Sequence, residues 1–413
     1  MRNTNKKGFT IVELVVVVAV IAILAAVLIP TFSGVINKAN MSADQKAVRD
    51  MNTALAIADV ENNANTFNDA VNALLASNIG MEKYKALAKD KAFYWVQSLK
   101  RVVYVDKDLN VVYPTEYADV EYDIEDGWYS LSGEVKTSDA WKDNKNGSEV
   151  AIANGAELVS LMQAFAEKDA DAAGITKVTL SADVDLMGAA VNFGKVTANV
   201  EFDGGNKTIY NLRNGASASL GNNNAANEPT SYGFGLFGEI TKNKVVEVKN
   251  VTFDGVAING VPGNGAVAAG HAGVVAGKID NGGKLIVTNV TISNCTVATE
   301  KKAGALVGYI EPGANLEVNG LTVSNVEIFA GREAAAVIGY LQCKRVNKTP
   351  VATVSITDLT VTNVTVSHDA SYGYTLSNDG SVATKDGEDN LGITSMDCWY
   401  IYESTKEGKN YHN

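Results

Sequence analysis

The hydrophobic pattern begins with an unbroken apolar run, LVVVVAVIAILAAVLI, at residues 14–29. With the apolar residues just before it, this run reaches about 20 residues, which is the hydrocarbon thickness of a bilayer at about 1.5 Å per helical residue. Beyond it, Ala47, Met51, Leu55 and Ala58 recur at helical spacing. The pattern predicts one long helix that crosses a membrane and continues as an amphipathic stalk.

Charged residues set the predicted orientation of this helix. Arg2, Lys6 and Lys7 precede the apolar run, and no acidic residue does. The positive-inside rule therefore places residues 1–8 in the cytoplasm and the rest of the chain outside. Glu13 lies at the start of the apolar stretch, where a carboxylate is costly unless it has a partner. A secretory signal peptide is the alternative, but no A-x-A-like site in a polar context follows the run.

The segment KKGFTIVEL, within residues 6–32, resembles the processing motif of type IV pilins and type II secretion pseudopilins. The resemblance implies that a prepilin peptidase cuts between Gly8 and Phe9 and N-methylates Phe9. It also implies that Glu13 pairs with the N-terminal ammonium of a neighbouring subunit during assembly. Pro30 matches the position where pilin helices bend, and proline removes a helical hydrogen bond. A plain uncleaved anchor with an accidental Glu13 is the alternative.

The next segment predicts a small α+β head. Thr66 is a candidate cap for a second helix that ends near Gly80. Residues 93–113 are rich in aromatic and β-branched residues, and the polar DKDLN interrupts them, which predicts a hairpin. Residues 136–150 are polar and rich in turn formers, so they are expected to be a linker.

Internal repeats follow a predicted helix at residues 155–168. GLFG at residue 235 recurs as GVVAG, GALVG and AAVIG, and the closing glycines are about 30 to 40 residues apart. A second block follows each copy, starting at Val248, Val287, Val318 and Ile356. Units of this length, with short strand patterns and no helical period, need to stack on one another to bury a hydrophobic face.

This region resembles the right-handed parallel β-helices of bacterial surface proteins, in particular their glycine-rich adhesin repeats. The expected fold is therefore a right-handed parallel β-helix capped by the helix at residues 155–168, with a β-sandwich as the alternative. Asn250, Asn289 and Asn363 are assigned one shared turn position, with Gly320 and Asp358 nearby, where residues adopt left-handed backbone or form ladders between coils.

The predicted organisation has five parts. They are a leader at residues 1–8, a membrane and stalk helix at 9–62, a head at 63–135, a linker at 136–150, and a β-solenoid with a cap helix and an irregular tail at 151–413.

Composition and charge limit the chemistry. A net charge of −12 argues against nucleic acid as a partner, because phosphate binding needs clustered Lys and Arg. The three cysteines, Cys295, Cys343 and Cys398, are too few for a disulfide framework, and whether any two pair is left open. No cofactor and no metal site is expected, although the acidic stretch at 386–390 leaves weak calcium binding open.

Three aspartates are candidates for the catalytic carboxylates of a β-helix glycosidase or lyase: Asp183, Asp185 and Asp203. Turn chemistry explains them better, because they stand where turns need Asp or Asn, so the chain is expected not to be an enzyme.

The sequence therefore predicts an exported, membrane-anchored pilin-like surface protein with a cytoplasmic N-terminus, present in the cell membrane and in extracellular filaments. A large C-terminal part favours a minor or tip subunit that presents an adhesion module. The expected partners are a prepilin peptidase, other pilin subunits, the membrane, and glycans or surface proteins. Two alternatives remain: a pseudopilin of a type II secretion or DNA-uptake system, and a surface carbohydrate-active enzyme.

Overall fold

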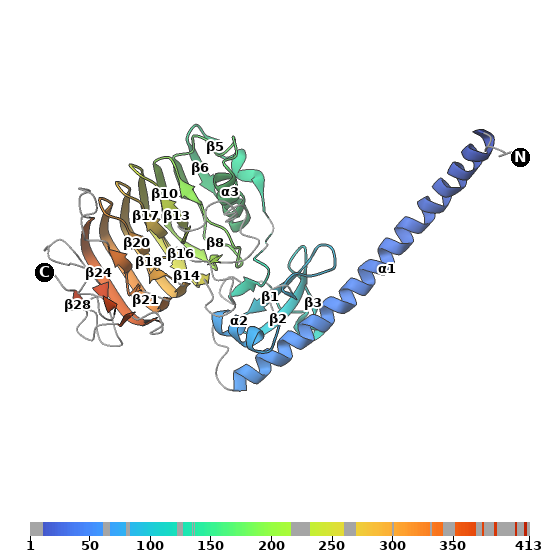
Figure 1. Cartoon of the computed structure of the whole chain (residues 1–413), viewed down its shortest axis with the longest axis horizontal. Helices are drawn as coiled ribbons and strands as arrows, with labels where there is room; N and C mark the ends of the chain where they lie inside the picture. The colour runs from blue at the N-terminus through green and yellow to red at the C-terminus, as the bar shows by residue number, and fades with distance from the viewer. Residues whose placement is uncertain are drawn as a thin grey trace, which may run out of the picture.

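The chain has a mixed architecture of one long helix, a small head and a large β-rich part (Figure 1). The computed structural model describes residues 11–60, 67–79, 83–121, 127–133, 135, 137–215, 232–259, 270–299, 301–330, 333–341 and 352–368, together with the short pairs 374–375, 384–385, 401–402 and 409–410. The long helix α1 (Ile11–Val60) projects from the head at its N-terminal end. The predicted leader, residues 1–8, lies outside the described residues.

The head is built on the C-terminal half of α1. Its elements are α2 (Phe67–Ala76), β1 (Lys91–Val96), β2 (Arg101–Asp106), β3 (Val111–Tyr113) and β4 (Trp128–Ser130). The strands form one antiparallel sheet in the order β3-β2-β1-β4. The predicted hairpin is therefore two successive hairpins, because the chain first turns at residues 97–100 and the DKDLN segment makes the second turn.

Apolar side chains at helical spacing join α1 to the head. Val48, Met51 and Leu55 are fully buried and share a core with Phe67 of α2 and Trp95 of β1. This spacing puts all three α1 residues on one helix face, which is why half of α1 is held against the sheet.

The β-rich part contains three sheets. The largest consists of β5 (Lys145–Asn146), β6 (Glu149–Ile152), β7 (Lys177–Leu180), β8 (Val184–Asp185), β10 (Val200–Tyr210), β11 (Arg213–Gly215), β14 (Val245–Asp254), β15 (Ala257–Asn259), β18 (Lys284–Thr299), β21 (Asn315–Ala330) and β24 (Thr353–His368). The second consists of β12 (Tyr232–Phe234), β16 (Gly270–Ala272), β19 (Lys302–Gly304) and β22 (Glu333–Ala335). The third consists of β9 (Lys195–Val196), β13 (Phe237–Ile240), β17 (Ala276–Ile279), β20 (Val307–Ile310) and β23 (Ile338–Leu341). Two further pairs are β25 (Tyr374–Thr375) with β26 (Thr384–Lys385), and β27 (Ile401–Tyr402) with β28 (Lys409–Asn410).

Each sequence repeat adds strands to all three sheets: the first contributes β14 and β15 to the largest sheet, and each later repeat contributes one long strand there. Val287 of β18 pairs with Val318 of β21, which pairs with Ile356 of β24, so the repeated blocks lie in register. The pairing between repeats is parallel, unlike the antiparallel pairing of a β-sandwich. Inward-pointing Val, Ile, Leu, Ala and Phe side chains from all three sheets form one continuous core.

The repeated glycine motifs are explained by a close approach of the second and third sheets. A Cβ atom added to Gly277 would lie 2.2 Å from the Cα of Gly233, and one added to Gly308 would lie 2.4 Å from the nitrogen of Ala272. Both distances are below any real contact, so only glycine fits where the chain passes between these two sheets.

Two columns of polar residues mark the corners of the long strands. In the first, Asn250 donates to Asp203 and Asn289 donates to Asn250. Gly320 and Asp358 occupy the same corner in the next two repeats, and all four corner residues from Asn250 to Asp358 have positive φ. The expected left-handed, laddering positions are therefore present.

The second column corrects one assignment. Asn294 donates to Asp254, Asn325 donates to Asn294, and Asn363 donates to Asn325, at 2.7, 3.2 and 2.7 Å. Asn363 belongs to this column and not to that of Asn250 and Asn289. The two corners of a repeat are separated by a few residues along the strand, and the sequence pattern alone does not distinguish them.

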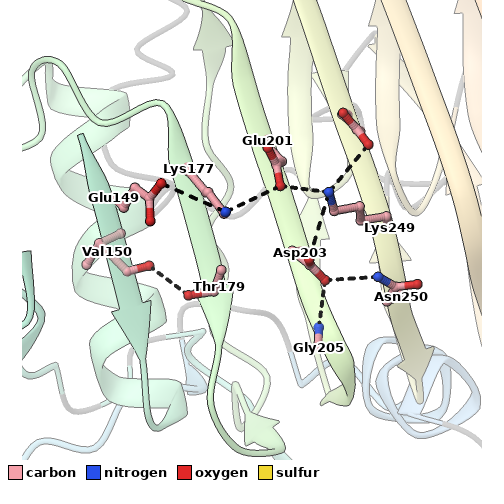
Figure 2. A network of polar contacts seen from close by, with 10 residues as sticks. Glu149, Val150, Lys177, Thr179, Glu201, Asp203, Gly205, Lys249 and Asn250 are labelled. Carbon is pink, nitrogen blue, oxygen red and sulfur yellow. Dashed lines mark hydrogen bonds and ion pairs between the residues drawn. The ribbon is translucent and has the colours of Figure 1, made fainter. Parts of the chain in front are cut away.

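An ion-pair network crosses the outer face of the first four parallel strands (Figure 2). Lys249 Nζ lies 2.7 Å from Glu201 and 3.6 Å from Glu247, and Lys177 lies 3.8 Å from Glu201 on its other side. Single exposed pairs contribute little, but opposite charges in adjacent strands favour the observed register over a shifted one.

The segment expected as a linker, residues 136–150, is instead part of the β-rich part. It contains a short 3-10 helix (Asp139–Lys142), β5 and the start of β6. Trp141 is fully buried in the large core, and its indole nitrogen donates to Ser160 of α3 (Gly155–Glu167) at 3.0 Å. The polar composition of the segment reflects turns that surround one large buried aromatic side chain. The predicted helix at residues 155–168 matches α3, which lies at the β5–β6 end of the stack (Figure 1).

Candidate assembly helix and its junction with the β-rich part

The sequence places the assembly residues at the N-terminal end of α1. Gly8 and Phe9 lie outside the described residues. Glu13 and Pro30 lie within α1, whose helical backbone passes through both without interruption. The side chains of residues 12, 13 and 23–31 are not described, so the pairing of Glu13 and a bend at Pro30 stay predictions.

The projecting half of α1 exposes large apolar side chains. Ile11 is 81% exposed, and Phe32, Val35 and Ile36 are about 60% exposed. The full set of such residues on this half is Ile11, Leu14, Val15, Val16, Val17, Val18, Val20, Ile21, Phe32, Val35 and Ile36. Exposed apolar side chains gathered in this way, between residues 11 and 21 and between residues 32 and 36, mark an interface with a protein or a membrane. Among the side chains that the structure describes, no helix combines the length and the hydropathy of a membrane span.

A buried carboxylate fastens α1 to the head where the helix emerges. Asp44 accepts hydrogen bonds from the backbone nitrogens of Leu87 and Ala88, at 2.8 and 2.9 Å, and from the hydroxyl of Tyr104 at 2.9 Å. Hydrogen bonds to a charged acceptor are stronger than neutral ones. The three donors come from two separate segments of the head, so Asp44 joins the helix to both.

Two asparagines on α1 complete this attachment. Asn52 donates to the carbonyl of Val102 and accepts from its nitrogen, at 2.9 and 2.7 Å. One turn before Asp44, Asn40 donates to the carbonyl of Leu87 at 3.1 Å. Asn52 thereby satisfies backbone groups of β2 that face the helix and not another strand. The head is therefore held rigidly on α1 from residue 40 onward.

Arg213 of β11 joins the β-rich part to the head. Its guanidinium is buried, donates to the carbonyls of Ser130 and Leu131 at 2.8 and 2.9 Å, and lies 4.7 Å from the ring centre of Phe67. Burial lowers the pKa of Arg213 to about 10, so the group stays charged at neutral pH. A buried cation is tolerated here because carbonyl dipoles and an aromatic face surround it.

Direct backbone contacts reinforce this junction. The nitrogen of Ser130 donates to the carbonyl of Met187 at 2.8 Å, and the hydroxyl of Tyr129 donates to the carbonyl of Gly255 at 3.1 Å. The ring of Tyr129 stacks on Phe67, with the ring centres 4.7 Å apart. Tyr129 is thus a core aromatic that lies at a contact between the two parts.

The three aspartates considered as catalytic groups each serve local structure. Asp183 accepts from the nitrogen of Thr208, and Asp203 accepts from Gly205 and Asn250. Asp185 accepts from Met187 and Asn211 at 2.7 and 2.9 Å. Within the described ranges, no group of three or more His, Cys, Asp or Glu side chains is arranged to hold a metal ion. Of the cysteines, Cys295 is buried, while Cys343 and Cys398 lie outside the described residues.

Asp185 has a second feature, which the sequence does not reveal. Its Oδ2 atom is buried and accepts no hydrogen bond, and burial raises the pKa of the carboxyl group to about 7. The titratable group that faces it is Tyr94 of the head, whose pKa is raised first by burial and then by Asp185. Folding therefore favours the protonated form of Asp185.

This raised pKa predicts a specific pH dependence of stability. The native state binds the Asp185 proton more tightly than the unfolded state does, so stability falls as the pH rises from about 4 to about 7. We expect Asp185→Asn to remove that loss. The melting temperature of the variant minus that of the wild type should therefore increase as the pH rises from about 4 to about 8. Thermal unfolding across this range measures it, with Asp183→Asn as the exposed control. A constant difference between Asp185→Asn and the wild type at every pH would contradict the assignment.

Comparison with known proteins agrees with the N-terminal pattern. Residues 3–29 match the family model of the prokaryotic N-terminal methylation motif. The chain carries the methylation motif of type IV prepilins. The match ends within α1, so it covers the projecting, apolar half of the helix and none of the head or the β-rich part.

One curated relative extends this similarity. The chain is 41% identical over 66 residues to the type IV wide pilus major component PilA4 of Thermus thermophilus, across 16% of this chain. The chain spans half the length of that protein. No solved structure matches the chain. The motif and the relative together support a pilin-like surface protein.

Proposed function

We propose that the chain is an exported, pilin-like filament subunit, minor or at the filament tip, which presents its β-rich part as an adhesion module. The observation that carries this proposal is α1. Its N-terminal half bears the methylation motif and exposes apolar side chains, whereas its C-terminal half is anchored in the head by Asp44 and Asn52. Such a helix has one half available for packing against other subunits.

In the proposed pathway, the chain is first held in the cell membrane by residues 14–29, with its N-terminus in the cytoplasm. A prepilin peptidase removes residues 1–8 and methylates Phe9. The mature helix then leaves the membrane and packs into a filament, where Glu13 meets the N-terminal ammonium of a neighbouring subunit. The apolar surface of α1 serves both states, because lipid and other helices are both apolar surroundings.

The proposal for the β-rich part is a right-handed parallel β-helix that binds glycans or surface proteins. Parallel pairing in register across successive repeats supports this fold. The junction at Arg213 and Tyr129 supports a rigid presentation of this part by the head. Binding rests on the repeat architecture alone, and a glycan and host-protein screen with the assembled filaments tests it. A blank screen counts against adhesion and leaves filament assembly untouched.

Processing supplies the first prediction for this function. We expect mass spectrometry of sheared filaments to find this chain beginning at Phe9 with one added methyl group. The resemblance of KKGFTIVEL to the prepilin processing motif implies that the cut falls between Gly8 and Phe9. Finding the chain only in membranes, with residues 1–8 attached, would overturn the pilin assignment.

A further inference from the structure

One segment of the head is basic in a chain that is acidic overall. The sequence KYKALAKDK at residues 83–91 holds four lysines and one aspartate, whereas the whole chain has a net charge of −12. Lys107, in the turn after β2, lies near the same segment, because it lines the same pocket as Lys85, Lys89 and Lys91. The lysines at positions 83, 85, 89, 91 and 107 are here called the basic rim.

Four of the five rim lysines, all but Lys83, line a pocket of about 410 Å³ with partly apolar walls. Leu87 lies in the middle of the segment, lines the same pocket and is 64% exposed. Three aspartates lie beside these lysines: Asp90 and Asp106 line the same pocket, and Asp108 pairs with Lys107, so the lysines outnumber the aspartates by five to three. The rim therefore combines a positive charge with an exposed apolar side chain.

The attachment of this segment to α1 fixes where the rim lies. Leu87 is hydrogen-bonded to Asn40 and Asp44, so the rim sits at the level where the helix enters the head. The exposed apolar surface of α1 continues as far as Ile36. At about 1.5 Å per residue, Asn40 is about 6 Å beyond Ile36 along the helix. The rim thus borders the projecting apolar half of α1.

We infer that the basic rim binds the anionic headgroups of the membrane from which α1 projects, since Asn40 is about 16 Å beyond Ile29, where the proposed span ends, and the rim lysines extend from that level. This rests on the proposed function, in which the apolar half of α1 is held in lipid before assembly. Lysines bordering a membrane-inserted helix are attracted to anionic lipid within about one Debye length of about 10 Å. A tilted subunit would lift the rim from the surface, so this contact orients the head.

The choice of lipid follows from position and chemistry. The segment that carries the rim meets α1 at Asn40 and Asp44, beside the apolar half of the helix, and a polyanion such as duplex DNA would leave Leu87 exposed beside phosphate. The rest of the chain also repels nucleic acid through its net negative charge. Duplex DNA and inorganic phosphate are accordingly included in the test as competing ligands.

The test uses the full mature chain reconstituted in vesicles. One set is phosphatidylcholine alone, and the other contains phosphatidylglycerol as about a third of the lipid. An amine-reactive label followed by peptide mass spectrometry measures the labelling rate of each lysine. We expect Lys89 and Lys91 to be labelled about 3-fold more slowly in the anionic vesicles, and we expect salt near about 0.5 M to restore the rate because it screens the charges. Lys207 of β10 and Lys242, in the turn after β13, are internal controls whose rates stay unchanged.

A pair of variants separates the rim from general charge. In anionic vesicles, Lys89→Gln/Lys91→Gln is expected to raise the labelling rate of Lys83 toward its value in phosphatidylcholine. The matched variant Lys207→Gln/Lys242→Gln removes the same charge and is expected to leave that rate unchanged. Hydrogen exchange of β2 in each variant confirms that the head stays folded.

Any of three outcomes would overturn the inference. The first is equal labelling of Lys89 and Lys91 in the two kinds of vesicle. The other two are protection of these lysines in phosphatidylcholine vesicles by duplex DNA and their protection there by inorganic phosphate. If the chain floats with both kinds of vesicle but Lys89 and Lys91 are labelled equally in them, lipid binding by the rim is rejected and membrane anchoring by α1 is not. A chain that floats with neither rejects membrane anchoring, and the rim with it.

Discussion

Glu13→Ala is expected to lower the amount of this chain in filaments about tenfold while leaving cleavage after Gly8 largely intact. The resemblance to pilins gives Glu13 a partner, the N-terminal ammonium of a neighbour, inside an apolar helix bundle. In Glu13→Ala this ammonium is left without its partner. An unpaired charge at the centre of a membrane helix costs about 2.5–3.5 kcal/mol, and about 1.4 kcal/mol corresponds to a tenfold change in an equilibrium. Losing the pair removes the attraction that aligns each new subunit. Quantitative immunoblotting of sheared filaments and membranes measures the ratio.

A conservative variant serves as the control for this prediction. Glu13→Asp keeps the charge on a shorter side chain and is expected to retain more assembly than Glu13→Gln, which keeps the shape and loses the charge. Mass spectrometry of the membrane fraction checks that all three variants are cleaved. Normal filament levels of Glu13→Ala would remove the physical argument for this carboxylate.

Asp44→Ala is expected to lower the free energy that holds the head on α1 by about 3 kcal/mol. The buried carboxylate accepts hydrogen bonds from Leu87, Ala88 and Tyr104, and its removal leaves these donors without an acceptor. Hydrogen bonds to charged groups contribute about 1.5–3 kcal/mol each, and neighbouring ones are not additive. Hydrogen exchange in the mature full-length chain measures the effect, which is expected as a more than about 100-fold faster exchange of the β2 residues.

Asp50→Ala is the matched control for Asp44. Asp50 is on the same helix, is more than half exposed, and pairs with Lys46 one turn earlier. An exposed pair of this kind contributes about 0.3–0.5 kcal/mol, so its loss is expected to leave β2 exchange nearly unchanged. Equal exchange in Asp44→Ala and Asp50→Ala would show that the head is held by its apolar core without help from Asp44.

Several elements could be predicted because their signals are local. The helix expected at residues 9–62 is observed as α1, and the cap helix expected at 155–168 is observed as α3. α1 follows from the unbroken apolar run at residues 14–29 and from the helical spacing of the apolar residues after it. The repeated Val, Ile and Leu positions lie in register in β18, β21 and β24. A period of two within a repeat fixes which side chains point inward, so register followed from the pattern.

Other features could not be predicted because they depend on partners distant in the sequence. Residues 136–150 have the composition of a linker, yet Trp141 is buried against α3 and brings the segment into the core. The assignment of Asn363 to the column of Asn250 is wrong, because an Asn in a strand-rich repeat carries no sign of which corner it occupies until the register is known. Arg213 shows no local signal for a junction, since its contacts are on another part of the chain.

The N-terminal helix depends both on local sequence and on contacts that only the folded head provides. The methylation motif and the long apolar helix could be recognised from consecutive residues alone, because both are local patterns. The folded structure decided where that helix stops being exposed, because burial from Asp44 onward depends on donors from the head, far along the chain. It also decided that the rim lysines gather beside the apolar half of α1, since a folded head brings residues 83–91 back to the helix at Asn40.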